Sequence, residues 1–288
     1  MPSLQHIRRK ITSVKSTQKI TKAMKMVAAA KLKRAQDRIL SARPYAQKMA
    51  TVLKSLIRGV NRDQHPLLRR REARKIELIV ITADRGLCGA FNANILRRAQ
   101  DFIREKREAG FEVGISVVGR KSRDFFRRRD IAPRQMWVQI FDRLNYAHGA
   151  EIGQDLIGRY TEGKFDELYL LYNEFKSVMQ QRVTIEKLLP IEPPEAAETM
   201  TGSYLYEPDE TALLARLLPK YIEAQVFRAL LESAAGELGA RMTAMDAASR
   251  NAGELIRKMT LVYNKTRQAV ITKELMDIVG GAEAMRGS

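Results

Sequence analysis

The sequence predicts a mixed fold in which a long antiparallel coiled coil, formed by the N- and C-terminal helices, carries an inserted Rossmann-like α/β domain. Two long stretches at the ends have the composition of uninterrupted helices, and between them short apolar runs alternate with helical patterns. The expected boundaries are residues 1–58 for the first helix, 59–208 for the α/β domain and 209–288 for the last helix.

The last helix is the element around which the others are organised. From Lys220 to Val279 there is no proline, and the glycines are few. A helix of that length would measure ~90 Å, whereas a compact globule of this chain would be ~50 Å across, so we expect the helix to protrude. Steps of four and three trace one largely apolar face, which is typical of a coiled-coil seam. The seam positions are Ala224, Phe227, Leu231, Ala234, Leu238, Arg241, Met245, Ala248, Ala252, Leu255, Met259, Val262, Thr266 and Ala269.

The first helix is predicted from about Leu4 to Ile57, with Ser3 as its N-cap. Antiparallel pairing with the last helix is the natural arrangement, although pairing of each helix with another chain stays open on periodicity alone. The apolar stripe begins at Ile7, Ile11 and Val14, is expected to shift to Ile20, Met24 and Val27, and continues at Ala28 and Leu32.

Between the helices the period changes. A polar hinge, Gly59 to Lys75, leads into alternating strands and helices, which predict a largely parallel sheet. We expect Pro219 to kink the chain between a short helix capped by Asp209 and the long one. The expected strands are Ile76–Ile81, Phe111–Val118, Glu167–Asn173 and Gln180–Leu189, with Met136–Phe141 either strand or loop and Tyr204–Pro208 extended; the helices are Phe91–Glu108, Lys121–Arg129 and Gly149–Thr161.

Charge is distributed unevenly along the chain. Residues 1–75 hold 21 Lys and Arg against 3 Asp and Glu, so the whole net charge of +18 lies there. A solvated basic face, nucleic acid, anionic lipid or an acidic protein partner would each fit this excess. The single cysteine, Cys88, excludes an internal disulfide, and neither a membrane span nor a secretory segment is present, so we expect a cytoplasmic protein.

Enzymatic motifs are incomplete. The loop Asp84–Gly89 follows a strand but lacks the third glycine of the dinucleotide fingerprint, and Gly114–Ser122 has Arg120 where the phosphate loop needs lysine. Cys88 has no histidine in a recognisable arrangement with it, and Asp166 with Glu167 flanks a strand, which predicts solvent-facing carboxylates. The three histidines His6, His65 and His148 lack metal-site spacing.

We therefore expect no catalytic residue, metal or cofactor in this chain. Nucleic acid binding by the basic helix is the alternative function, limited to phosphate contact because Tyr45 is nearly the only aromatic residue there.

Three motifs resemble one family. The segments Gln18–Ala29, Asp84–Asn92 and Leu261–Leu275 are similar, in the same order, to the gamma subunit of F-type ATP synthases. The resemblance spans essentially the full chain. It implies that the two terminal helices form an asymmetric coiled coil inside a ring of three alpha and three beta subunits, while the α/β domain binds epsilon and the c-ring.

The resemblance also implies a function. The subunit would be a non-catalytic central rotor that couples ion-driven c-ring rotation to conformational change at the beta subunits, with no nucleic acid involved. It would associate peripherally with the cytoplasmic face of a bacterial plasma membrane. Chloroplast members carry a regulatory insertion with a cysteine pair, which this sequence lacks, so thiol control is not expected.

Site residues follow from the resemblance position by position. Met24 matches a shaft position near an acidic loop of the beta subunit, and the basic residues around it would face that loop. The expected contacts with beta are Met24, Lys19, Lys22, Lys25, Arg267 and Gln268, and those with the c-ring and epsilon are Tyr204, Tyr206 and Glu207. Coiled-coil packing is the alternative role for Met24, and a solvated face is the alternative for Arg267 and Gln268.

Overall fold

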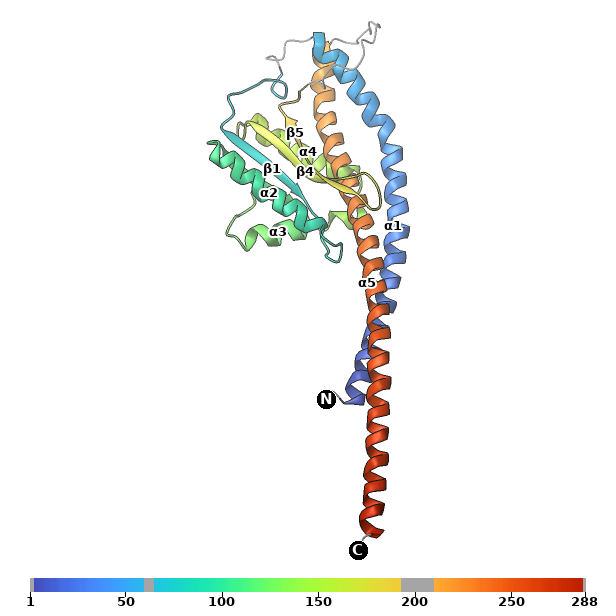
Figure 1. Ribbon diagram of the computed structural model, residues 1–288. Helices are drawn as coiled ribbons and strands as arrows, with labels where there is room; N and C mark the ends of the chain where they lie inside the picture. The colour runs from blue at the N-terminus through green and yellow to red at the C-terminus, as the bar shows by residue number, and fades with distance from the viewer. Residues whose placement is uncertain (1–2, 60–64, 193–209, 287–288) are drawn as a thin grey trace. The chain divides into compact units, whose positions relative to one another are not determined.

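The computed structural model describes residues 3–59, 65–192 and 210–286. The chain divides into two compact units, one made of Met1–Val27 with Met242–Ser288, here called the two-helix unit, and the other of Ala28–Arg241, here called the α/β unit. Helix α1, Leu4–Gly59, and helix α5, Glu210–Arg286, each contribute to both units (Figure 1). Each unit is described by itself below.

The α/β unit contains the five strands that the structure describes. Their order in the sheet is β3-β2-β1-β4-β5, and every neighbouring pair is parallel except β4 with β5. The predicted, largely parallel sheet is therefore confirmed. The elements are β1 Lys75–Ile81, α2 Phe91–Glu108, β2 Glu112–Val118, α3 Arg120–Arg127, β3 Gln135–Trp137, α4 Tyr146–Thr161, β4 Glu167–Phe175 and β5 Gln181–Leu189.

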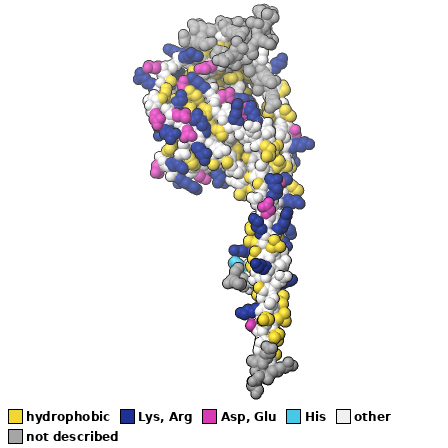
Figure 2. Space-filling view, viewed as in Figure 1, with side chains coloured by type: hydrophobic (Ala, Val, Ile, Leu, Met, Phe, Trp, Pro, Cys, Tyr) yellow, Lys and Arg dark blue, Asp and Glu magenta, His cyan; other side chains and the backbone are white. Residues whose placement is uncertain are grey.

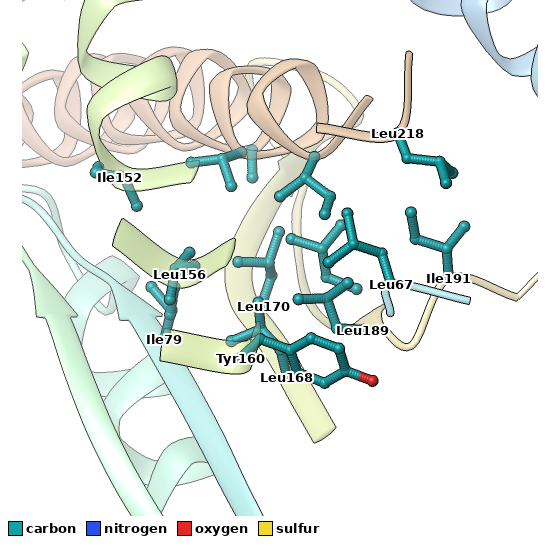
Figure 3. Close-up of a cluster of buried hydrophobic side chains, with 14 of the residues drawn as sticks. Leu67, Ile79, Ile152, Leu156, Tyr160, Leu168, Leu170, Leu189, Ile191 and Leu218 are labelled. Carbon is teal, nitrogen blue, oxygen red and sulfur yellow. The ribbon is translucent and has the colours of Figure 1, made fainter. Parts of the chain in front are cut away.

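Side chains alternate between the two faces of the sheet, and each face has its own core. Leu78 and Val80 of β1 point into a cluster with α2, whereas Ile79 and Ile81 point into a larger cluster with α4. The larger cluster also contains residues of α1, such as Leu56, and a long run of α5. Figure 3 shows this side, where side chains of the sheet and of α4 meet those of α5. The terminal helices are thus part of the core of the α/β unit.

Two stretches differ from the sequence prediction, and a third is not described by the structure. Helix α4 begins at Tyr146 instead of Gly149, because Asn145 and His148 form a capping box. The stretch left open at Met136–Phe141 is divided between the three-residue strand β3 and a 3₁₀ helix, Ile140–Arg143. The extended piece Tyr204–Pro208 and the cap Asp209 lie outside the described residues.

Helix α5 runs through Pro219 without a break, so the prediction of a separate short helix before Pro219 is wrong. Proline removes one backbone donor and crowds the preceding turn, which costs about 3 kcal/mol in an isolated helix. Here Leu214, Leu218 and Ile222, on both sides of Pro219, are all buried in the core. We attribute the continuity of the helix to this packing.

In the two-helix unit, α1 and α5 lie antiparallel. Gln18 Nε2 donates to the carbonyl oxygen of Ser249 at 3.2 Å, and Lys25 Nζ lies 2.6 Å from Asp246 Oδ1. Residues that come later in α1 therefore meet residues that come earlier in α5. Together with the sheet, this arrangement confirms the predicted fold class.

The predicted shift of the α1 stripe is wrong at Ile20 and Val27, although Met24 is half-buried. Ile20 and Val27 are 57% and 56% exposed, whereas Thr21 is buried. The inward face instead keeps the alternating steps of four and three residues that begin at Ile7. Its later positions are Gln18, Thr21 and Lys25. Polar side chains are tolerated there because each finds a partner: the Thr21 hydroxyl donates to the Gln18 carbonyl oxygen, and Gln18 and Lys25 reach α5.

The seam of α5 also differs in phase from the prediction. Met245 and Ala252 are buried as expected, but Leu255 and Val262 are 41% and 52% exposed. Beyond Ala252 the inward positions follow steps of four and then three residues, whereas the predicted seam takes three and then four. They are Ile256, Met259, Tyr263 and Thr266.

No helix in the described part of the chain has a segment that is long and apolar enough to cross a membrane.

Candidate partner-binding surfaces

The outward face of α1 in the two-helix unit combines cations with apolar side chains. Lys19 and Lys22 are exposed, and next to them Ile20, Met26 and Val27 remain more than half exposed. No acidic residue precedes Asp37 in the sequence. Figure 2 shows Lys and Arg side chains interspersed with apolar ones along this helical region. We call Lys19, Ile20, Lys22, Met26 and Val27 the basic-apolar face; it suits a partner with both carboxylates and apolar groups.

Met24 and Lys25 lie between this face and α5. Both are half-buried, and Lys25 forms the ion pair with Asp246, which also lies 3.3 Å from Arg250. The hydrogen bond from Lys25 lowers the pKa of Asp246 and keeps its carboxyl ionised. Lys25 thus has a partner within its own chain, unlike the predicted contacts Lys19 and Lys22, for which the structure shows no ion pair within the described chain.

The end of α5 extends past the start of α1. A shallow groove lined by Ile7 of α1 and by Met259 and Val262 of α5 marks the region where the two helices still run together. Beyond Thr266 every described side chain is exposed, including those of Arg267 and Gln268. Large apolar side chains are exposed in this segment: Val270, Ile271, Leu275, Met276, Ile278 and Val279. Apolar exposure on this scale is typical of a surface that another protein covers.

The loop after β1, Asp84–Gly89, is held by hydrogen bonds to other parts of the α/β unit. Asp84 Oδ1 accepts hydrogen bonds from the backbone N–H groups of Arg120, at the start of α3, and of Gln139, both at 3.0 Å. A carboxylate of this loop therefore already lies at the N-terminus of α3, the helix that follows the incomplete phosphate-loop stretch Gly114–Ser122. Arg241 of α5 closes the loop from the other side by donating to the Gly86 carbonyl oxygen at 3.1 Å. This geometry fits a structural loop.

Cys88 belongs to the same loop, and its side chain is buried. Burial raises the pKa of its thiol, Glu237 raises it further, and Arg241 opposes the shift. We expect a thiol reagent to label Cys88 of the folded chain at least about tenfold more slowly than in urea, with a rate that keeps rising above pH 9. Because Cys88 is the sole cysteine, the urea-unfolded chain serves as its own control. Equal rates in both states would contradict the burial.

The remaining candidates have structural roles. His148 belongs to the capping box, and the backbone N–H of Leu67 donates to His65. Asp166 accepts from two backbone N–H groups, and Glu167 pairs with Lys187 at 2.7 Å with its side chain only 17% exposed, so the prediction that Glu167 faces solvent is wrong. Within the described residues, no cluster of three or more His, Cys, Asp or Glu side chains could hold a metal ion.

Sequence reasoning missed three buried carboxylates. They are Glu77 in β1 and Glu223 and Glu237 in α5, all inside the α/β unit, and Glu237 pairs with the predicted seam residue Arg241. A carboxylate within the apolar run of β1 was visible in the sequence. Gly149 and Gly153, four residues apart on α4, were also visible as a small-residue pair; Glu223 packs against both. Tyr204, Tyr206 and Glu207, predicted to meet the c-ring side, lie outside the described residues.

Comparison with known proteins gives consistent results. The family described as ATP synthase matches residues 3–285. The chain is 50% identical over 288 residues to the ATP synthase gamma chain of Geotalea daltonii and 49% identical over 286 residues to that of Pelotomaculum thermopropionicum. The alignments cover 100% and 99% of this chain, respectively, and 100% of each relative.

Solved structures show the same fold. The central stalk and c-ring structure of Tetrahymena thermophila mitochondrial ATP synthase contains a chain with a TM-score of 0.61 and 28% identity, covering 80% of this chain and 99% of that one. A chain in the Euglena gracilis mitochondrial OSCP/F1/c-ring structure has a TM-score of 0.73 at 23% identity, covering 98% and 94%. Sequence and fold agree along the whole chain, which belongs to the ATP synthase gamma-chain family.

Proposed function

We propose that this chain is the central rotor shaft of an F-type ATP synthase, coupling ion-driven rotation of the c-ring to conformational change at the catalytic beta subunits for ATP synthesis or hydrolysis. The observation that carries the proposal is the exposure of two surfaces of the two-helix unit. Its basic-apolar face and its unpaired α5 end are exposed surfaces of the kind that partner subunits cover. Relatives about 50% identical over the full chain are named as ATP synthase gamma chains.

The mechanism requires a shaft without threefold symmetry. Three identical catalytic sites can differ only if each meets a different face of the shaft, since a partner shifts an equilibrium only by differential contact. α1 offers cations and apolar groups, whereas α5 past Thr266 offers mainly apolar groups on a single helix. Rotation would present these surfaces in turn to each of three beta subunits, with three alpha subunits completing the ring.

Site residues are assigned on the same basis. Lys19, Lys22 and Met24 meet an acidic loop of beta, Arg267 and Gln268 meet beta near the catalytic sites, and epsilon and the c-ring bind the α/β unit. Lys25, whose side chain stays 42% exposed beside its pair with Asp246, is assigned to the same contact with beta. Tyr204, Tyr206 and Glu207 are assigned to the c-ring and epsilon side from the resemblance alone.

The chain itself performs no chemistry in this proposal. Asp84 accepts a backbone hydrogen bond at the N-terminus of α3, the helix that follows the incomplete phosphate-loop stretch Gly114–Ser122, and the thiol of Cys88 is buried. The gamma chain is a peripheral member of its complex, at the cytoplasmic face of a bacterial plasma membrane. Bacterial relatives at about 50% identity support this location.

Purification of the tagged chain from detergent-solubilised membranes of its host tests the proposal. We expect alpha, beta, epsilon and c subunits to co-purify together with ATP hydrolysis. Recovery of the chain without these subunits and without ATPase activity, alone or with nucleic acid, would overturn the rotor assignment. A nucleic-acid arm would instead show strongly salt-dependent binding.

Charge reversal on the basic-apolar face should weaken coupling. In the assembled complex, Lys19→Glu with Lys22→Glu would place like charges against an acidic loop, and we expect ATP-driven ion pumping per ATP hydrolysed to fall on the order of threefold. The measurement is pumping and hydrolysis in the same inverted vesicles. Arg107→Glu, on the exposed surface of α2, is the matched control and should change neither. An unchanged ratio in the double variant would remove these lysines from the proposed contact.

A further inference from the structure

Helix α5 is held within the α/β unit by an unusually close contact with α4. The two glycines Gly149 and Gly153 of α4 face it. A Cβ on Gly149 would lie 2.6 Å from Phe227 Cβ, and one on Gly153 would lie 3.1 Å from Glu223 Cα. No larger residue fits at Gly149 without moving a helix, so the two backbones meet more closely than side chains would otherwise allow.

Glu223 lies at the centre of this contact and is 1% exposed. Tyr146 Oη donates to Glu223 Oε2 at 2.9 Å, and Gln154 Nε2 donates to Oε1 at 3.3 Å. Lys220, one turn earlier on α5, lies 2.8 Å from Oε2. Burial raises the pKa of Glu223, but the three hydrogen bonds outweigh burial and lower it, so the carboxylate stays charged.

The ring of Tyr146 adds a packing contact on the same side. It meets Phe227 edge-on, with ring centroids 5.6 Å apart. Tyr146 therefore contacts two residues of α5 that are one helical turn apart, through its hydroxyl and through its ring. Such directional contacts resist rotation of α5 about its own axis. Apolar packing alone would resist this rotation less.

A second contact holds α5 from another direction. Arg228 lies five residues after Glu223, which is about 140° further around the helix at about 100° per residue. Its Nη2 is 2.6 Å from Glu186 Oε2 of β5, and its guanidinium lies over the Tyr172 ring at 5.9 Å. α4 and the sheet thus contact the same two turns of α5 on different sides of the helix.

We propose that the contact formed by Gly149, Gly153, Tyr146 and Glu223 locks the rotational phase of α5 in the α/β unit and so acts as a torque-bearing joint. The inference rests on the proposed rotor function. α5 continues as one helix from the α/β unit into the two-helix unit. A twist applied to the α/β unit reaches the catalytic subunits more fully when α5 cannot slip against α4. These four are positioning residues, since none is placed at a catalytic site.

The joint is tested in the assembled complex with this chain as its gamma subunit. The variants are Gly149→Ala, which separates the helices, Glu223→Gln, which removes the charge at equal volume, and Tyr146→Phe, which removes one hydroxyl. Gly158→Ala is the matched control, because it lies on the same helix and its added Cβ meets nothing within 4 Å. The catalytic ring is immobilised, a probe is attached to the c-ring, and its angular fluctuations are recorded without nucleotide.

We expect the angular variance to rise about twofold or more in Gly149→Ala and Glu223→Gln, less in Tyr146→Phe, and not at all in Gly158→Ala. ATP hydrolysis should persist while ion pumping per ATP falls. A residue that served folding alone would change the yield of complex but not the angular variance of the complexes recovered. If Gly149→Ala does not assemble, Glu223→Gln and Tyr146→Phe decide the question.

The proposed joint would be overturned if the assembled variants had the same angular variance and the same ion pumping per ATP as the unmodified complex. That result differs from failure of the rotor proposal, in which the unmodified chain itself would neither assemble with alpha, beta and c subunits nor rotate.

Discussion

Replacing Gly119 by alanine is expected to lower the free energy of unfolding of the α/β unit by about 3–5 kcal/mol. Gly119 joins β2 to α3 with φ +94°. An added Cβ would lie 2.2 Å from the carbonyl oxygen of Thr82. Backbone cannot yield as a side-chain tip would, so β1 and β2 would have to separate where Thr82 N donates to the Val118 carbonyl oxygen at 2.9 Å.

Urea unfolding of the full chain, followed by Trp137 fluorescence, measures this effect. Trp137 is the only tryptophan, is buried, and lies in β3 of the α/β unit. Gly110→Ala is the matched control: its φ is +88°, but an added Cβ meets nothing. We expect it to cost only about 1–2 kcal/mol, from the backbone alone. Equal losses in both variants would mean that the close approach to Thr82 is unimportant.

Replacing Glu77 by alanine should be comparably damaging, at about 3–5 kcal/mol. Glu77 is wholly buried in the central strand β1. Its Oε1 accepts from Ser116 Oγ and lies 3.2 Å from Arg159, and its Oε2 lies 3.5 Å from Arg134, an ion-pair distance without a hydrogen bond. Removing the carboxylate leaves Arg159, whose side chain is 14% exposed, without its buried partner.

Glu112→Ala is the control for this prediction. Glu112 pairs with the same Arg134 at 2.8 Å, but its side chain is 58% exposed, so the loss should stay below about 1 kcal/mol. Replacing the pair together, with Glu77→Leu and Arg159→Met, should recover most of the stability, because neither charge is then left buried alone. A small loss in Glu77→Ala, measured by the same Trp137 signal, would show that water reaches the site.

The sheet could be predicted well from the sequence because apolar runs and turn residues agree there. The apolar run Ile76–Ile81 is too short for a buried helix and predicts a buried strand. The observed strand β1 differs from it only by starting one residue earlier, at Lys75. Helix lengths were harder to predict. Pro219 stops an isolated helix, and only the tertiary core that buries Leu218 and Ile222 shows why α5 continues through it.

The phase of the coiled coil could not be read correctly because polar residues occupy inward positions. Thr21 and Ser249 look like surface residues, so an apolar pattern shifts the seam toward Ile20 and Val262, which the structure leaves exposed. The Thr21 hydroxyl is satisfied locally by the Gln18 carbonyl oxygen, whereas the Gln18 side chain is satisfied by the backbone carbonyl of Ser249, more than two hundred positions away. The basic character of α1 was visible from composition, but which cations stay free was not, because Lys25 is paired with Asp246.

The division of the chain also sets an order of events during synthesis. The α/β unit is one continuous segment, Ala28–Arg241, whereas the two-helix unit draws its residues from both ends. Domains generally fold as units while the ribosome is still at work, so the sheet and its cores can form before the last part of α5 has left the ribosome. The first turns of α1 must then wait, with Ile7 and Thr21 uncovered, until the last part of α5 emerges. A nascent chain of this kind exposes an apolar stripe to which a chaperone can bind for as long as the last segment is being made.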